Sequence, residues 1–98
     1  MPTYLVLMNW TDQGIKTFEG SPGRADAGQE EEMAKLGVLR KEIFWTVGPY
    51  DVVMLCEAPD EESMTSALLR IGAAGNVRTT TLRAFSQEEF DRMAARAR

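Results

Sequence analysis

Hydrophobic residues concentrate in four short stretches of the chain, at residues 4–10, 38–47, 52–57 and 76–84. Each stretch is rich in apolar, β-branched or aromatic residues and is flanked by turn-forming residues, a pattern typical of β-strands. Residues 4–10 and 52–57 are apolar at both alternating sets of positions. Strands that are apolar on both faces are usually covered on both sides, so we expect residues 52–57 to be central in a sheet and both faces of residues 4–10 to be covered.

The stretch 38–47 alternates less regularly than the others. Leu39, Ile43 and Trp45 are expected to share one face of this strand, because side chains two positions apart point the same way. Lys41 interrupts that face, and Arg40 is expected to point to the opposite side.

Polar segments with helical signals fill the intervals between the strands. Thr11 is expected to cap a short first helix. Ser21 as a cap, followed by Pro22 at the first helical position, predicts a second helix that runs to about Leu36. Gly37 can end that helix in a left-handed conformation.

Two further helices are predicted in the second half of the chain. Asp60 caps the first of them, which has an apolar stripe at spacings of four and three, formed by Met64, Leu68 and Ile71. Ser86 and Glu89 have the spacing of a capping box at the start of the last helix. Phe90 and Met93 are expected on the inner side of that helix.

The predicted order is strand, helix, strand, strand, helix, strand, helix, in a single domain over residues 1–98. This order predicts an α+β fold, the ferredoxin-like split βαβ sandwich, in which an antiparallel sheet carries its helices on one face. One helix layer leaves the apolar residues on the second face uncovered. We therefore expect a homo-oligomer, either a dimer or an assembly of dimers, that covers this face with a second copy.

Charge and hydropathy limit the partners and the location. The net charge is −4, and the acidic residues occur in runs at 30–32, 60–62 and 88–89. Because nucleic acids and anionic membranes are bound through clustered Lys and Arg, neither is an expected partner. The chain has no stretch of about 18 apolar residues and no signal-peptide pattern at its start, so the expected location is the cytoplasm.

The residue types argue against several kinds of chemistry. The chain has no histidine, which removes the commonest general base and the commonest metal ligand near neutral pH. Its one cysteine, Cys56, lies within an apolar strand and has no activating histidine. The sequence therefore predicts no catalytic residue, no metal site and no cofactor.

The turn Gly48-Pro49-Tyr50-Asp51 has two interpretations. In the structural one, Gly48 and Pro49 set a hairpin corner, Tyr50 covers the end of the sheet and Asp51 accepts hydrogen bonds from backbone amides. In the functional one, Tyr50 and Asp51 lie at the rim of a cleft, and Asp51 binds a cationic or hydroxyl group of a ligand.

Three more side chains are candidates for a ligand site. Trp10 and Trp45 lie near strand ends, where they can pack in the core or an interface, or form the walls of a pocket. Arg78 and Arg83 lie on opposite faces of the last strand, and one of them can pair with a ligand carboxylate or with Asp51. The candidate ligand site thus comprises Trp10, Trp45, Tyr50, Asp51 and Arg78.

With these elements placed, the chain resembles the GYD domain family. The resemblance rests on an ordered series of segments at residues 11–15, 21–24, 45–51, 57–60 and 75–85. It implies a ferredoxin-like fold of the dimeric α/β-barrel type, without a particular activity. A more distant likeness is to the effector domain of Lrp/AsnC-type regulators, which also have a Gly-x-Tyr-Asp turn and hold small metabolites at subunit contacts.

These observations favour a non-catalytic oligomeric module that binds a small molecule or has a regulatory role. The alternative is a cofactor-free enzyme of the dimeric α/β-barrel kind, in which Tyr50, Asp51 and an arginine replace the missing histidine. A third possibility is a protein that serves only to oligomerise.

Overall fold

The computed structural model describes residues 1–98, apart from the side chain of Ala27. Four strands form one antiparallel sheet in the order β2-β3-β1-β4. They are β1 (Thr3–Trp10), β2 (Leu39–Trp45), β3 (Val52–Glu57) and β4 (Val77–Ala84). The two strands that are apolar on both faces, β1 and β3, are the central ones, and this confirms the prediction made for β3. The order confirms the α+β, ferredoxin-like arrangement.

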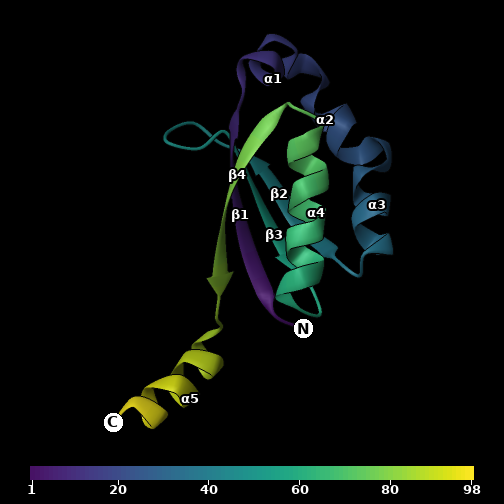
Figure 1. Ribbon diagram of the computed structural model, residues 1–98. Helices are drawn as coiled ribbons and strands as arrows, with labels where there is room; N and C mark the ends of the chain where they lie inside the picture. Colours follow the sequence, from purple (N-terminus) through teal and green to yellow (C-terminus); the bar gives the residue numbers. More distant parts are fainter.

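Helical segments make the two crossovers, and α3 and α4 lie on the same side of the sheet (Figure 1). The first crossover is built from five short pieces in succession, namely α1 (Asp12–Lys16), the 3₁₀ turn η1 (Phe18–Gly20), α2 (Ser21–Arg24), the π-helical turn η2 (Ala25–Gln29) and α3 (Glu30–Lys35). The second crossover is the single helix α4 (Glu61–Ala73). A last helix, α5 (Gln87–Ala97), projects away from the end of β4 (Figure 1).

The core lies between the sheet and the layer formed by α3 and α4. Alternate side chains of the two central strands point into it, and they are Tyr4, Val6 and Met8 from β1 and Val52, Met54 and Cys56 from β3. The helices contribute Met33, Met64, Ala67 and Ile71. Each large apolar side chain removed from water stabilises the fold by about 1.5–3 kcal/mol, so this layer contact determines which face of each strand turns inward.

The opposite face of the sheet, here called the open face, is also apolar. Leu5, Leu7, Val53 and Leu55 are half-buried at its centre. Towards the sheet edges, Leu39, Phe44 and Leu82 are 44%, 57% and 46% exposed. The predicted second apolar face is thus present.

A β-bulge makes one sequence expectation wrong. In the pairing of β2 with β3, Arg40 is opposite Cys56 and Glu42 is opposite Leu55, so Lys41 is the extra residue. One extra residue reverses the alternation, so Leu39 falls on the open face and the Arg40 side chain turns towards the helix layer. There Arg40 donates to the carbonyl of Ala25 (3.1 Å) and forms ion pairs with carboxylates on η2 and α3, those of Asp26 (3.2 Å) and Glu30 (2.6 Å).

The helix boundaries confirm three predicted caps and correct a fourth. Thr11, Asp60 and Ser86 each accept a backbone N–H from the residue three positions later. Ser21, in contrast, is the first residue of α2, and Gly20 precedes it as the cap. The predicted long helix from 21 to 36 is interrupted by the π-helical turn, where Gly28 has φ +84°.

The last helix has the predicted capping box, but its predicted inner side is wrong for a single chain. Phe90 is 60% exposed and Met93 is 37% exposed. The reason is visible in Figure 1, where α5 lies beyond the end of the sheet, away from α3 and α4. Within the described residues, no helix has the length and apolar character needed to cross a membrane.

Candidate functional site

The Gly-Pro-Tyr-Asp turn closes the hairpin between β2 and β3. The Thr46 N–H donates to the carbonyl of Asp51 (2.8 Å), and the Thr46 hydroxyl donates to the carbonyl of Tyr50 (2.6 Å). Gly48 has φ +136°, a conformation that favours glycine because other residues would be strained there. The turn is therefore a hairpin corner with a defined hydrogen-bond pattern.

The same turn is attached to the end of β1. The Asp51 N–H donates to the carbonyl of Met8 (2.8 Å), and the Asp51 carboxylate accepts the Trp10 N–H (2.9 Å). The Asn9 side chain donates to the carbonyl of Pro49 (2.7 Å). These bonds match the structural interpretation of the turn, while a ligand role for Tyr50 and Asp51 stays a prediction.

The other three candidate residues do not converge on one point. Trp10 and Trp45 both lie on the helix side of the sheet, since Trp10 continues the alternation of β1 and Trp45 pairs with Val52. Arg78 is exposed on the open face, opposite Asn9 in the register of β1 and β4. The structure brings Trp10 and Asp51 together and separates Trp45 from Arg78 by the thickness of the sheet.

Two segments that carry the family resemblance, residues 11–15 and 75–85, contact each other directly. The Thr11 N–H donates to the carbonyl of Asn76 (3.1 Å), and the Gln13 side-chain amide donates to Asn76 Oδ1 (3.0 Å). Gly14 is so close that a Cβ placed on it would lie 1.9 Å from the Asn76 oxygen. These residues form a joint between the start of α1 and the start of β4.

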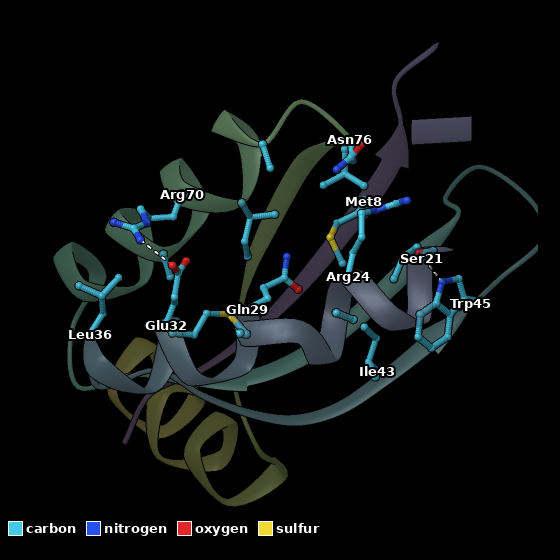
Figure 2. Close-up of a pocket in the computed structure, with 18 residues that line it drawn as sticks. Met8, Ser21, Arg24, Gln29, Glu32, Leu36, Ile43, Trp45, Arg70 and Asn76 are labelled. Atoms are coloured by element: carbon cyan, nitrogen blue, oxygen red, sulfur yellow. Dashed lines mark hydrogen bonds and ion pairs between the residues drawn. The ribbon is translucent and has the colours of Figure 1, made fainter. Parts of the chain in front are cut away.

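A hollow, here called the interhelix cavity, lies between the α2–α3 segment and α4, over the helix side of the sheet (Figure 2). Its volume is about 350 Å³. The sheet contributes apolar residues to the lining, which are Met8, Ile43, Trp45, Val52 and Val77. The helices contribute most of the polar groups, among them Ser21, Arg24, Gln29, Glu32 and Arg70.

Two polar contacts define the walls of this cavity, and Figure 2 shows both. The Trp45 indole N–H donates to the Ser21 hydroxyl at 2.9 Å, which fixes the indole ring against the start of α2. On the far side, Arg70 of α4 and Glu32 of α3 form an ion pair with an N···O distance of 2.8 Å. This pair connects the two helices across the cavity.

Of the predicted ligand residues, only Trp45 lines the interhelix cavity. Sequence analysis missed Arg24, Gln29, Glu32 and Arg70, because charged and polar residues on predicted helices look like ordinary solvated positions. The sequence does carry one indication of the irregular segment beside the cavity. Gly23 and Gly28 lie inside the predicted helix, and glycine weakens regular helical structure.

Cys56 has the properties of a core thiol. It is fully buried, and this burial raises the pKa of its thiol from 9.0 to about 11, although the positive charge of Arg40 opposes the rise. A protonated thiol is a poor nucleophile and a poor metal ligand. Among the described residues, no group of three or more His, Cys, Asp and Glu side chains is arranged to hold a metal ion.

Comparison with solved structures shows where this fold also occurs. The chain resembles the leucine response regulatory protein of Mycobacterium tuberculosis, with a TM-score of 0.65 at 19% identity. That likeness covers 88% of this chain and 51% of the regulator, so the chain spans about half the regulator's length. A crystal structure from Thermus thermophilus matches with a TM-score of 0.54 at 27% identity, and covers 88% of this chain and 95% of that one. The structural side of the likeness to the Lrp/AsnC effector domain is thereby confirmed.

Sequence comparison gives a curated relative and a family. The relative is the glutamine synthetase and cystathionine beta-lyase binding protein of Thermus thermophilus, which is 36% identical over 84 residues. The alignment covers 86% of this chain and 88% of that protein. The family model of the GYD domain matches residues 4–94, so this chain belongs to the GYD domain family.

Proposed function

We propose that this chain is a non-catalytic regulatory module that acts as a homo-oligomer and binds a metabolic enzyme of the glutamine synthetase or cystathionine beta-lyase kind. The observation that carries the proposal is the relative named for binding these two enzymes, since the likeness extends over 86% of this chain and 88% of that protein. A likeness of that extent supports a shared role for the whole domain.

The geometry of the candidate residues favours binding over catalysis. A cofactor-free enzyme would need Tyr50, Asp51 and an arginine around one substrate. Asp51 instead accepts the Trp10 N–H, and Arg78 is exposed on the face opposite to Trp45. No observation on the described residues brings these groups to a common point, so the binding module is the better-supported function.

The open face supports the homo-oligomeric part of the proposal. It presents Leu5, Leu7, Val53 and Leu55 at its centre, and contiguous apolar surfaces of this kind often mark sites of protein–protein interaction. A second copy with the same face is the simplest cover, because most soluble homo-oligomers are closed two-fold pairs. Two sheets packed face to face about 10 Å apart would give the dimeric α/β-barrel type of assembly.

The test is direct binding of the purified chain to glutamine synthetase and to cystathionine beta-lyase from the same organism. We expect saturable association with at least one of the two enzymes at micromolar concentrations in biolayer interferometry, and co-elution in size-exclusion chromatography. An unrelated oligomeric enzyme of similar charge serves as the control. Absence of binding to both enzymes at 50-fold higher concentration would exclude the proposed function.

A further inference from the structure

We propose that the interhelix cavity is a binding site for a small monocarboxylate with an aromatic or branched apolar body. This inference goes beyond the proposed enzyme binding and does not depend on it. It rests on the size of the cavity, the chemistry of its two sides, and the irregular helical turn at its rim.

The volume and the floor of the cavity suit an apolar body of modest size. At about 350 Å³ the cavity is at the lower end of the range of small-molecule sites, which is about 300–1,000 Å³. Ile43, Val52 and Val77 form an apolar floor on the sheet. Met8 and Met33 also line it, and their flexible thioethers can adapt to an irregular or aromatic shape.

Trp45 provides a fixed wall for such a body. Its indole N–H already donates to the Ser21 hydroxyl at 2.9 Å, so the ring presents its apolar surface and offers no free donor to a ligand. Aromatic groups are favourable neighbours for such a ring, because offset or edge-to-face contacts stabilise them beyond simple burial. This wall therefore favours an aromatic or branched apolar ligand over a sugar.

The helix side of the cavity indicates the charge of the ligand. Arg24 and Arg70 provide two positive charges in the lining and Glu32 provides one negative charge, which leaves a local excess of one positive charge. Each guanidinium has five N–H donors. The Nη1 of Arg24 binds Thr17, and the Nη2 of Arg70 binds Glu32, so both groups retain donors for a ligand. One excess positive charge matches a monocarboxylate better than a phosphate dianion.

The rim of the cavity is a π-helical turn held in place from the sheet. Ala25, Gly28 and Gln29 of η2 all line the cavity, and Gly28 has a positive φ of 84°. π-helical turns inside helices occur frequently at functional sites, because the wider turn changes the direction of its side chains. Arg40 holds this turn through the Ala25 carbonyl and the Asp26 carboxylate, so the rim is preorganised.

The test uses 3-phenylpropionate as the probe and 3-phenylpropan-1-ol as its neutral match, each titrated into ¹⁵N-labelled protein. The acid should cause saturable shifts of the Trp45 indole N–H resonance. The alcohol should bind with a Kd at least tenfold higher than that of the acid. Shifts centred on Trp10 or on the open face, or no saturable shift at 10 mM acid, would overturn the proposal.

Charge variants decide whether the two arginines bind the carboxylate. Arg70→Gln and Arg24→Gln should each raise the Kd of the acid about tenfold, as expected for loss of one charge-assisted hydrogen bond. Glu32→Gln should lower the Kd severalfold, because it removes a competing carboxylate, and a purely structural role would not produce this gain. Arg96→Gln on α5 makes the same charge change as the arginine variants outside the cavity, and it should leave the Kd unchanged.

A rim variant keeps the test independent of the charged residues. Ala74 is exposed and lines the cavity, so Ala74→Phe should obstruct the cavity while the fold is retained. Loss of acid binding in this variant, with an unchanged melting temperature, supports the site. Wild-type affinity for the acid in Ala74→Phe would overturn the proposal, and so would wild-type affinity in Arg24→Gln, Arg70→Gln and Glu32→Gln together. Binding to the partner enzyme should be the same in all of these variants, because it does not depend on the cavity.

Discussion

The Asp51 carboxylate accepts the backbone N–H of Trp10 at 2.9 Å, across 41 positions of the sequence. This bond joins the β2–β3 hairpin corner to the end of a central strand. The Asp51 N–H donates to Met8 in the same region, so the residue binds β1 through both its main chain and its side chain. The most recognisable turn of the sequence is thus a structural joint.

Substitution of Asp51 should therefore affect stability in a graded way. Asp51→Asn keeps a neutral acceptor and should lower the free energy of unfolding by about 0.5–1.5 kcal/mol. Asp51→Ala leaves the Trp10 N–H without its partner and should cost about 1–3 kcal/mol. Urea denaturation measures both values. If both variants are as stable as the wild type but no longer bind the partner enzyme or an acid ligand, the result would instead support the ligand role of Asp51.

Gly14 should be intolerant of any side chain. A Cβ at this position would lie 1.9 Å from the Asn76 oxygen, and the neighbouring group is backbone, which cannot rotate away. Gly14→Ala should destabilise the protein by about 3 kcal/mol, in the range of severe overpacking. Gly23→Ala is the matched control, because no described atom beyond the local helix backbone lies within 4 Å of its Cβ position and alanine is the better helix former. A similar unfolding midpoint for the two variants would contradict this account.

The strands were predictable from their local composition, and the central position of β3 was predictable because this strand is apolar on both faces. The orientation of the first part of β2 was not predictable. The alternation of Leu39, Ile43 and Trp45 assumes an uninterrupted strand, and the bulge at Lys41 reverses it. A bulge adds one residue without a clear composition signal, so only the pairing with β3 reveals it.

The interhelix cavity could not have been predicted from the sequence. Its charged groups come from positions as distant as Arg24 and Arg70, and the contact of Glu32 with Arg70 depends on how two helices pack on the sheet. The Ser21–Trp45 bond has the same origin, since Ser21 has the residue type of a helix cap but follows a 3₁₀ turn and is the first residue of α2. Periodicity identifies helix faces, but it does not identify which faces meet.

Cys56 should make stability depend on pH in the alkaline range. Its pKa is raised to about 11 in the folded chain from 9.0, so the unfolded chain releases the proton first as pH increases. The stabilisation is complete below pH 9 and is lost progressively between pH 9 and pH 11. Urea midpoints from pH 7 to 10.5 should fall more steeply for the wild type than for Cys56→Ala. Parallel curves, or rapid labelling of the native thiol at pH 8, would contradict a buried protonated thiol.

The two faces of β1 should respond differently to a charge. Leu7 lies on the open face, so Leu7→Asp should leave the chain folded and dissociate the homo-oligomer. Val6 is fully buried in the core, and Val6→Asp should prevent folding, since an unpaired charge there has no partner. Thr65→Asp on the exposed side of α4 controls for added charge and should change neither property.

Light scattering on an eluting peak distinguishes these results. The wild type and Thr65→Asp should have at least twice the mass of one 10.9 kDa chain, whereas Leu7→Asp should have the mass of one chain. A wild-type mass of 10.9 kDa, or an unchanged oligomer in Leu7→Asp, would show that the open face is not the contact between copies.

The exposed helix α5 leads to the last prediction. It has 11 residues, and isolated helices shorter than about 12–15 residues are marginal in water even with good helix formers. The Ser86–Glu89 capping box supports its first turn, but Phe90 remains 60% exposed and Met93 37% exposed. We expect α5 to become protected in the homo-oligomer, where the apolar side formed by these two residues packs against a second copy.

Amide hydrogen exchange of residues 90–97 should then be slow in the wild type and fast in the Leu7→Asp monomer. Phe90→Ser should accelerate this exchange and weaken self-association, while Asp91→Asn on the polar side should do neither. Equal protection of α5 in the monomer and in the oligomer would mean that the helix is stable without a partner.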